Sequence, residues 1–162
     1  MKVEVQPYNP IWSSLYEVEL SELREGLGST LIRAHHIGST AIPGIWAKPI
    51  VDIILEVRSI QALDEPDQPL VGPSYEAMGE YGIAGRRYFR KYRGDGLRSH
   101  HIHAYAVGSP EVLRHLAFRD FLLAHPDIAQ QYSDLKRALA EANRNDMRAY
   151  VHGKEPFVRE IE

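Results

Sequence analysis

The chain has 162 residues, of which 44% are hydrophobic and 25% charged, and these proportions exclude a disordered, fibrous or coiled-coil protein. The length is typical of one folded domain, so we expect a single domain over residues 1–162. The absence of cysteine excludes disulfides, zinc ribbons, iron–sulfur clusters and cysteine nucleophiles. The chain starts without a leader-like apolar segment and has no run of ~18 apolar residues, which predicts a soluble, cytoplasmic protein with no membrane contact.

The net charge of −3 conceals one strongly basic segment. Residues 86–98 contain six basic residues and one acidic residue, a local charge of +5. A basic segment in an acidic protein indicates a local anionic ligand such as a phosphate, because a nucleic-acid surface usually needs a basic domain overall. A solvated hairpin face is the alternative explanation.

The first part of the chain predicts a strand, a helix and a second strand. Residues 3–6 favour a short strand, and residues 31–37 favour a longer one. Asn9-Pro10 is a helix start, because asparagine caps a helix and proline at the first helical position loses no needed N–H. Apolar residues then recur every three or four positions up to Gly28, which predicts one buried helix face: Trp12, Tyr16, Leu20, Leu23 and Leu27.

The middle of the chain predicts a buried strand followed by helices. Residues 49–57 are rich in isoleucine and valine and favour a strand with Asp52 near its centre. Residues 59–64 and about 67–79 favour helices, with ends poorly defined by three prolines.

The second half predicts a β-hairpin and three helices. Residues 86–93 and 99–107, joined by a glycine-rich turn, favour the hairpin. Helix starts with capping or proline chemistry occur at Ser109-Pro110, Pro126 and Asn145-Asp146. The order of elements predicts an α/β or α+β domain with a mixed β-sheet, flanking helices and a C-terminal helical segment.

A short turn follows the strand at residues 31–37 and contains Gly38, Ser39 and Thr40. Glycine lets a backbone approach a ligand closely, and the two hydroxyls suit a phosphate oxygen. An ordinary turn without a ligand has the same composition.

Asp52 lies inside the apolar run IVDIIL. A carboxylate in apolar surroundings is costly without a metal, a partner charge or hydrogen bonds. Metal binding or catalysis is therefore one explanation, and an ion pair with Lys48 or a hairpin arginine is the other.

The hairpin contains the cluster His100-His101-Ile102-His103. Strand alternation places His101 and His103 on one face, ~6–7 Å apart along the strand. Two imidazoles so placed can hold one transition ion such as Zn, Mn or Ni, especially with Asp52 on a neighbouring strand. A polar network within the sheet is the alternative.

Five segments, taken in order along nearly the whole chain, resemble one protein family. They are HIGSTAIPGIWAKPIVDIILEV, GRRYFRKY, SHHIHAY, GSPEVLRHLAFRDFLLAHPDIAQQYSDLKRAL and AYVHGKEPFV. The chain is therefore similar to the GrpB family. The resemblance implies a nucleotidyltransferase-superfamily fold with a palm like that of DNA polymerase β. Some family members are fused to dephospho-coenzyme A kinase, which implies a link to nucleotide or coenzyme A metabolism.

The superfamily pattern has a Gly-Ser motif followed by two carboxylates one residue apart. Gly38-Ser39 matches the motif and Asp52 matches the first carboxylate, whereas Ile54 stands in the place of the second. A third carboxylate is expected on a later strand, but residues 99–107 contain none, and the two histidines there are its nearest chemical substitutes.

The resemblance and the residues together predict a metal-dependent nucleotidyltransferase that binds a nucleotide or another phosphorylated small molecule. Its catalytic residue is Asp52, which holds a divalent metal (Mg, Mn or Zn) together with His101 and His103. Its expected phosphate-binding residues are Gly38, Ser39, Thr40, Lys48, Arg86 and Arg87.

Two alternatives belong to other functional classes. The missing carboxylates favour a non-catalytic module that senses a nucleotide or a coenzyme A-type ligand for a protein partner. The cluster of one aspartate and two histidines instead favours a metal-dependent hydrolase of phosphate esters.

Overall fold

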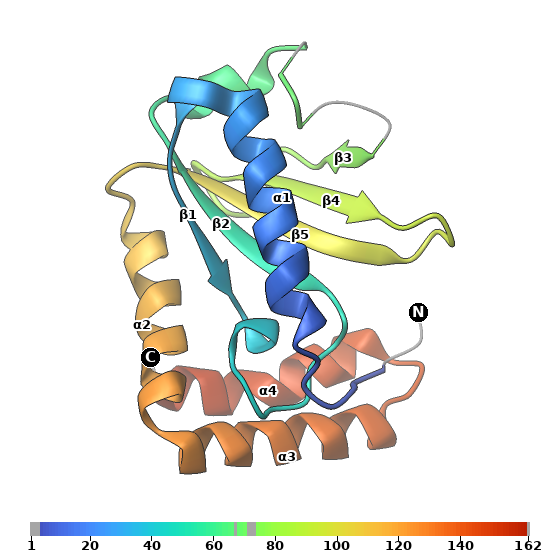
Figure 1. Ribbon diagram of the computed structural model, residues 1–162. Helices are drawn as coiled ribbons and strands as arrows, with labels where there is room; N and C mark the ends of the chain where they lie inside the picture. The colour runs from blue at the N-terminus through green and yellow to red at the C-terminus, as the bar shows by residue number, and fades with distance from the viewer. Residues whose placement is uncertain (1–3, 67, 71–73, 162) are drawn as a thin grey trace.

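The computed structural model describes residues 4–66, 68–70 and 74–161, and Figure 1 shows the arrangement of its elements. In chain order these are α1 (Ile11–Leu27), η1 (Gly28–Thr30), β1 (Leu31–Ile37), η2 (Ser39–Ala41), β2 (Val51–Val57), η3 (Ile60–Asp64), β3 (Tyr75–Ala77), β4 (Arg87–Tyr92), β5 (Arg98–Ala106), α2 (Pro110–Ala124), α3 (Pro126–Ala142) and α4 (Met147–Ile161). The segments labelled η are single turns of 3-10 helix.

The five strands form one mixed sheet in the order β1-β2-β5-β4-β3. The pair β2 and β5 is parallel, and the other neighbours are antiparallel. The helix α1 lies along one face of this sheet, α2 lies beside β1, and α3 and α4 pack together beyond one end of the strands (Figure 1). The predicted α+β architecture with a mixed sheet and a C-terminal helical segment is confirmed.

Strand alternation divides the core between the two faces of the sheet. Ile53, Phe89 and Ile102 pack against the apolar stripe of α1, as the helical periodicity predicts. Ile54 and Tyr105 point to the other face and pack against α2. The side chain of Asp52 therefore lies on the face opposite α1, at the end of β2 that is closest to the C-terminal helices.

Most predicted elements are confirmed because their signals are local. The strand at residues 31–37 has the predicted ends, and the hairpin strands differ from the prediction by one residue at each end. Capping fixes the helix starts: Ser109 accepts a hydrogen bond from the Glu111 N–H, and Asp146 accepts one from the Ala149 N–H.

Three predicted elements differ from the structure. The helix predicted at 67–79 is wrong for residues 75–77, which form β3 at the sheet edge, while residues 67 and 71–73 lie outside the described part. Prolines at 66 and 69 remove helical donors, and β4 offers an open edge to pair with. Of the strand predicted at 3–6, the described residues show one bridge, from Gln6 to Ala47. The helix at 59–64 is the short 3-10 turn η3.

No helix in the described ranges combines the length and the apolar character that crossing a membrane would require.

A buried ion pair joins α1 to the hairpin. Glu19 lies on the buried stripe of α1, is 2% exposed, and accepts a hydrogen bond of 2.7 Å from the Lys91 ammonium. The Tyr75 hydroxyl donates to the same carboxylate, so the pair also holds the edge strand β3. A buried carboxylate that loses its partner keeps its desolvation cost, so this pair matters more when broken than when replaced.

We expect Lys91→Met to lower the free energy of unfolding by about 3 kcal/mol, because it leaves Glu19 buried without its cation. Removing both charges in Glu19→Leu/Lys91→Met should restore most of the loss. Urea unfolding monitored by circular dichroism measures both variants. A single variant as stable as the wild-type protein would contradict the role assigned to the pair.

Candidate functional site

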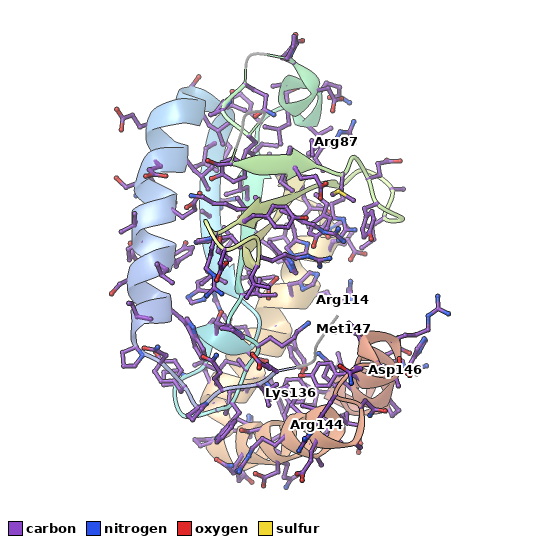
Figure 2. The ribbon with its side chains drawn as sticks, turned by 90° about the vertical axis from the view of Figure 1, so that its right-hand side faces the viewer. Arg87, Arg114, Lys136, Arg144, Asp146 and Met147 are labelled. Atoms are coloured by element: carbon purple, nitrogen blue, oxygen red, sulfur yellow. The ribbon has the colours of Figure 1, made fainter. Side chains whose placement is uncertain are left out.

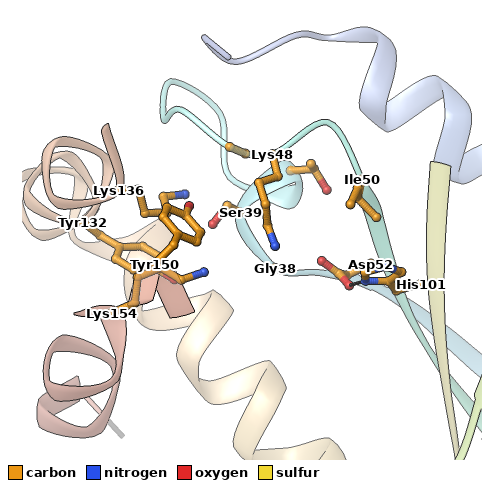
Figure 3. Close-up of a pocket in the computed structure, with 12 residues that line it drawn as sticks. Gly38, Ser39, Lys48, Ile50, Asp52, His101, Tyr132, Lys136, Tyr150 and Lys154 are labelled. Atoms are coloured by element: carbon orange, nitrogen blue, oxygen red, sulfur yellow. Dashed lines mark ion pairs between the residues drawn. The ribbon is translucent and has the colours of Figure 1, made fainter. Parts of the chain in front are cut away.

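A cavity of about 220 Å³ lies where the C-terminal helices meet the end of the sheet (Figure 3). One wall comes from the turn after β1 and from the start of β2, and the other comes from α3 and α4. The lining residues are Gly38, Ser39, Thr40, Ala47, Lys48, Ile50, Asp52, His101, Tyr132, Lys136, Tyr150 and Lys154.

The turn after β1 passes close to Asp52. Gly38 has a φ of 72°, a conformation that side chains rarely adopt, and a Cβ at this position would lie 2.8 Å from Oδ2 of Asp52. Thr40 is buried, and its hydroxyl is hydrogen-bonded to Nε2 of His36 at 2.9 Å. The glycine is therefore required for the approach of this turn to the carboxylate.

Asp52 is held by the two histidines of β5. Parallel pairing places it beside His101, and its Oδ1 lies 3.5 Å from His101 Nδ1 and 3.4 Å from His103 Nε2. Burial opposes ionisation of the carboxyl, but the hydrogen bonds from the two histidines outweigh it and hold the Asp52 pKa well below its usual range. Asp52 is therefore an ionised carboxylate at neutral pH.

His103 is engaged at both ring nitrogens. Its Nδ1 lies 3.3 Å from Nη1 of Arg86. A guanidinium can only donate, so Nδ1 accepts, and Nε2 carries the proton that His103 donates to Asp52. Arg86, His103 and Asp52 thus form one chain of hydrogen bonds, and neither imidazole nitrogen of His103 is free to bind a metal.

Three lysines from three separate segments line the cavity (Figure 3). Lys48 precedes β2, Lys136 lies on α3 and Lys154 lies on α4. Lys136 is 1% exposed, and its ammonium nitrogen has no hydrogen-bond partner within the described ranges. Its nearest aromatic neighbour is the Tyr132 ring, 4.6 Å away, and Lys154 lies 4.5 Å from the Tyr150 ring.

The environment of these lysines disfavours their charged forms. Burial, followed by repulsion from the other two lysines, lowers the pKa of Lys136 to about 6. Burial and Lys48 lower the pKa of Lys154 to about 8, and burial also lowers the pKa of Lys48. These shifts indicate that the described residues around the cavity supply too little negative charge to keep all three amines fully protonated.

The structure brings most of the predicted site residues together. Gly38, Ser39, Thr40, Lys48, Asp52 and His101 line the cavity, and His103 lies directly behind Asp52. Arg86 reaches His103, but its guanidinium is also held by the carbonyl oxygens of Glu80 and Tyr81.

The structure does not bring Arg87 to the site. Its guanidinium donates to both carboxylate oxygens of Asp64, at 2.7 and 3.0 Å. Tyr88 pairs with His103 and lies on the same face of the sheet as Asp52. Its neighbour Arg87 therefore points to the other face. Figure 2 shows Arg87 toward one end of the molecule and Lys136 toward the other.

Sequence reasoning missed Lys136, Lys154 and the two tyrosines beside them. One signal for Lys136 was present: it lies four residues after Tyr132 and four before Ala140, on the buried stripe of α3. A lysine at such a position is either satisfied by a partner or placed for a ligand.

The described residues do not fit a pair of divalent metal ions. Among them, no three His, Cys, Asp or Glu side chains are placed to hold one ion. Ile54, at the position of the expected second carboxylate, is 0% exposed and belongs to the core beneath α2. The geometry supports an anion site better than a metal site.

Comparison with known proteins gives a consistent family. The sequence model described as "GrpB protein" matches residues 2–162. The crystal structure of "conserved protein GrpB" from Enterococcus faecalis has a TM-score of 0.90 and 38% identity, covering 98% of this chain and 94% of that one. The "UPF0157 protein YqkA" of Bacillus subtilis is 44% identical over 99% of this chain.

The relatives include longer proteins. This chain spans 46% of the length of YqkA. A more distant relative, from Mycolicibacterium paratuberculosis, is named "Dephospho-CoA kinase"; it is 28% identical over 98% of this chain, which covers 44% of its length.

Replacement of Lys136 tests how much its buried amine destabilises the ligand-free protein. We expect Lys136→Met to stabilise the ligand-free protein by about 1–3 kcal/mol at pH 7, because it removes a buried polar group without a partner. Thermal unfolding measures the gain, with Arg148→Met on an exposed position of α4 as the control.

The gain should depend on pH with a definite sign. The Lys136 pKa is lower in the folded state, so the unfolded state binds more protons between pH 6 and 10. The destabilisation of the wild-type protein by Lys136 therefore decreases as the pH rises. The advantage of the variant should therefore be largest at or below pH 6 and small near pH 10. A variant less stable than wild type at pH 7 would contradict this account.

Proposed function

The protein belongs to the GrpB family, and from that premise we propose that it binds a nucleotide or another phosphorylated small molecule through the cavity between β2, α3 and α4. The observation that carries this proposal is the convergence of three lysines on a cavity whose described lining holds a single carboxylate, with Lys136 buried and without a hydrogen-bond partner among the described residues. A phosphate group supplies the acceptors and the negative charge that these lysines lack.

The size of the cavity supports recognition of the phosphate end of the ligand. A volume of about 220 Å³ is below the ≈ 300–1,000 Å³ of pockets that enclose whole drug-sized ligands. The phosphates enter the cavity, and the remainder of the ligand lies outside it. Relatives named dephospho-CoA kinase support a nucleotide or coenzyme A-type ligand.

Nucleotidyl transfer is the second candidate function, and the position of Asp52 favours it. This carboxylate lines the same cavity as the lysines and is oriented by two histidines, so it can accept a hydrogen bond from an acceptor hydroxyl and orient that hydroxyl, although its lowered pKa makes it a weak general base. The lysines would stabilise the charge of the phosphates during transfer. A hydrolase built on His103 as a metal ligand has less support, because both nitrogens of that ring are engaged.

Isothermal titration with inorganic pyrophosphate tests the proposed function. We expect Lys154→Ala to weaken binding about 10- to 100-fold, because it removes a hydrogen bond between charged groups. Arg148→Ala is the matched control, since it removes one positive charge from α4 outside the cavity lining and should leave the affinity nearly unchanged. Equal affinities of the wild-type protein and Lys154→Ala for pyrophosphate would rule out the lysine-lined cavity as the phosphate site.

A further inference from the structure

We propose that the cavity binds the metal-free form of its phosphorylated ligand, with Lys48, Lys136 and Lys154 in the role that divalent cations have in two-metal phosphoryl-transfer sites. The inference rests on the proposed function, because it specifies the ionic form in which that ligand binds. Its basis is the juxtaposition of one carboxylate and three lysines, one of them buried, around one cavity.

The first observation is the shortage of oxygen ligands. Mg²⁺ needs near-octahedral oxygen coordination, which proteins usually supply with carboxylates. Asp52 is the one carboxylate among the described lining residues, and its Oδ1 is already occupied by His101 and His103. Ile54, two residues further along the strand, is packed in the core with Ile37 and Tyr105.

The second observation is the position of the cations. Lys48, Lys136 and Lys154 come from the segment before β2, from α3 and from α4, so three separate segments direct an amine at one cavity (Figure 3). A divalent cation inside the cavity would be repelled by each of these amines that is protonated. Two-metal sites use their ions to neutralise phosphate oxygens, and the three amines, protonated as the anion binds, would supply up to three positive charges without a metal.

The third observation is the unmet hydrogen-bonding capacity of Lys136. Its ammonium has no acceptor among the described residues, and the groups facing it are Lys48, Lys154 and the Tyr132 ring. A free phosphate oxygen provides that acceptor and favours the protonated amine. A phosphate oxygen already coordinated to Mg²⁺ carries less charge and is a weaker partner.

The ligand side of the balance points the same way. Pyrophosphate complexed with Mg²⁺ has two fewer negative charges than free pyrophosphate. Because the electrostatic attraction scales with the product of the charges, the three lysines attract free pyrophosphate more strongly than its Mg²⁺ complex.

The experiment is calorimetric titration of the whole chain with inorganic pyrophosphate, once with EDTA and once with excess Mg²⁺. Potassium chloride at equal ionic strength is the control for screening. We expect Mg²⁺ to weaken the apparent affinity for pyrophosphate about tenfold or more. Mg²⁺ competes with the protein for the free anion, and the Mg²⁺ complex that forms binds poorly. Binding that requires Mg²⁺ would overturn this inference and leave the proposed function standing. Absence of binding in both conditions would overturn both.

Asp52→Asn separates the two kinds of site. In an anion site the carboxylate repels the ligand, so the nearly isosteric variant should bind metal-free pyrophosphate about 3-fold more tightly or better. In a metal site the same substitution abolishes binding. Thermal unfolding confirms that the variant is folded, and a folded variant with lost affinity would overturn the inference.

Discussion

The ammonium group of Lys136 lies inside the protein without a hydrogen-bond acceptor among the described residues, and the other features of the site are arranged around it. Burying this amine without an acceptor is costly and disfavours its protonated form, which lowers its pKa to about 6, and groups perturbed in this way cluster at functional sites. Lys48 and Lys154 share the cavity and add to the cost by repulsion. The cavity therefore favours an anionic ligand, because an anion would stabilise the protonated forms of these amines.

The fold explains how opposite charges face each other across one cavity. The sheet presents Asp52 at the start of β2, where a glycine turn and two histidines fix it, while α3 and α4 present Lys136 and Lys154. Asp52 remains ionised because its histidine neighbours compensate for burial. Asp52 and the three lysines can thus contact different parts of one ligand: the lysines bind its phosphates, and Asp52 accepts a hydrogen bond from a hydroxyl.

Local signals predicted much of the fold and half of the site. Alternation placed His101 and His103 on one face, the structure pairs their strand with that of Asp52, and capping residues marked the start of α2. Lys136 and Lys154 reach the cavity only because α3 and α4 dock on a turn about a hundred residues earlier, a tertiary contact that no local pattern encodes. Arg87 was predicted at the site because charge along a segment does not reveal which face of a strand each residue occupies. The edge strand β3 depends in the same way on pairing with a distant partner.

Membership of the GrpB family and a cavity built for an anion lead to one central claim, that Lys136 gains its missing partner from a ligand phosphate. Nuclear magnetic resonance of ¹³C-labelled lysine, titrated with pH, tests this directly through the Cε signal of Lys136. The account predicts a pKa near 6 in the free protein and a clear rise when metal-free pyrophosphate is added. A pKa near the unperturbed value of about 10.4, unchanged by pyrophosphate, would contradict it.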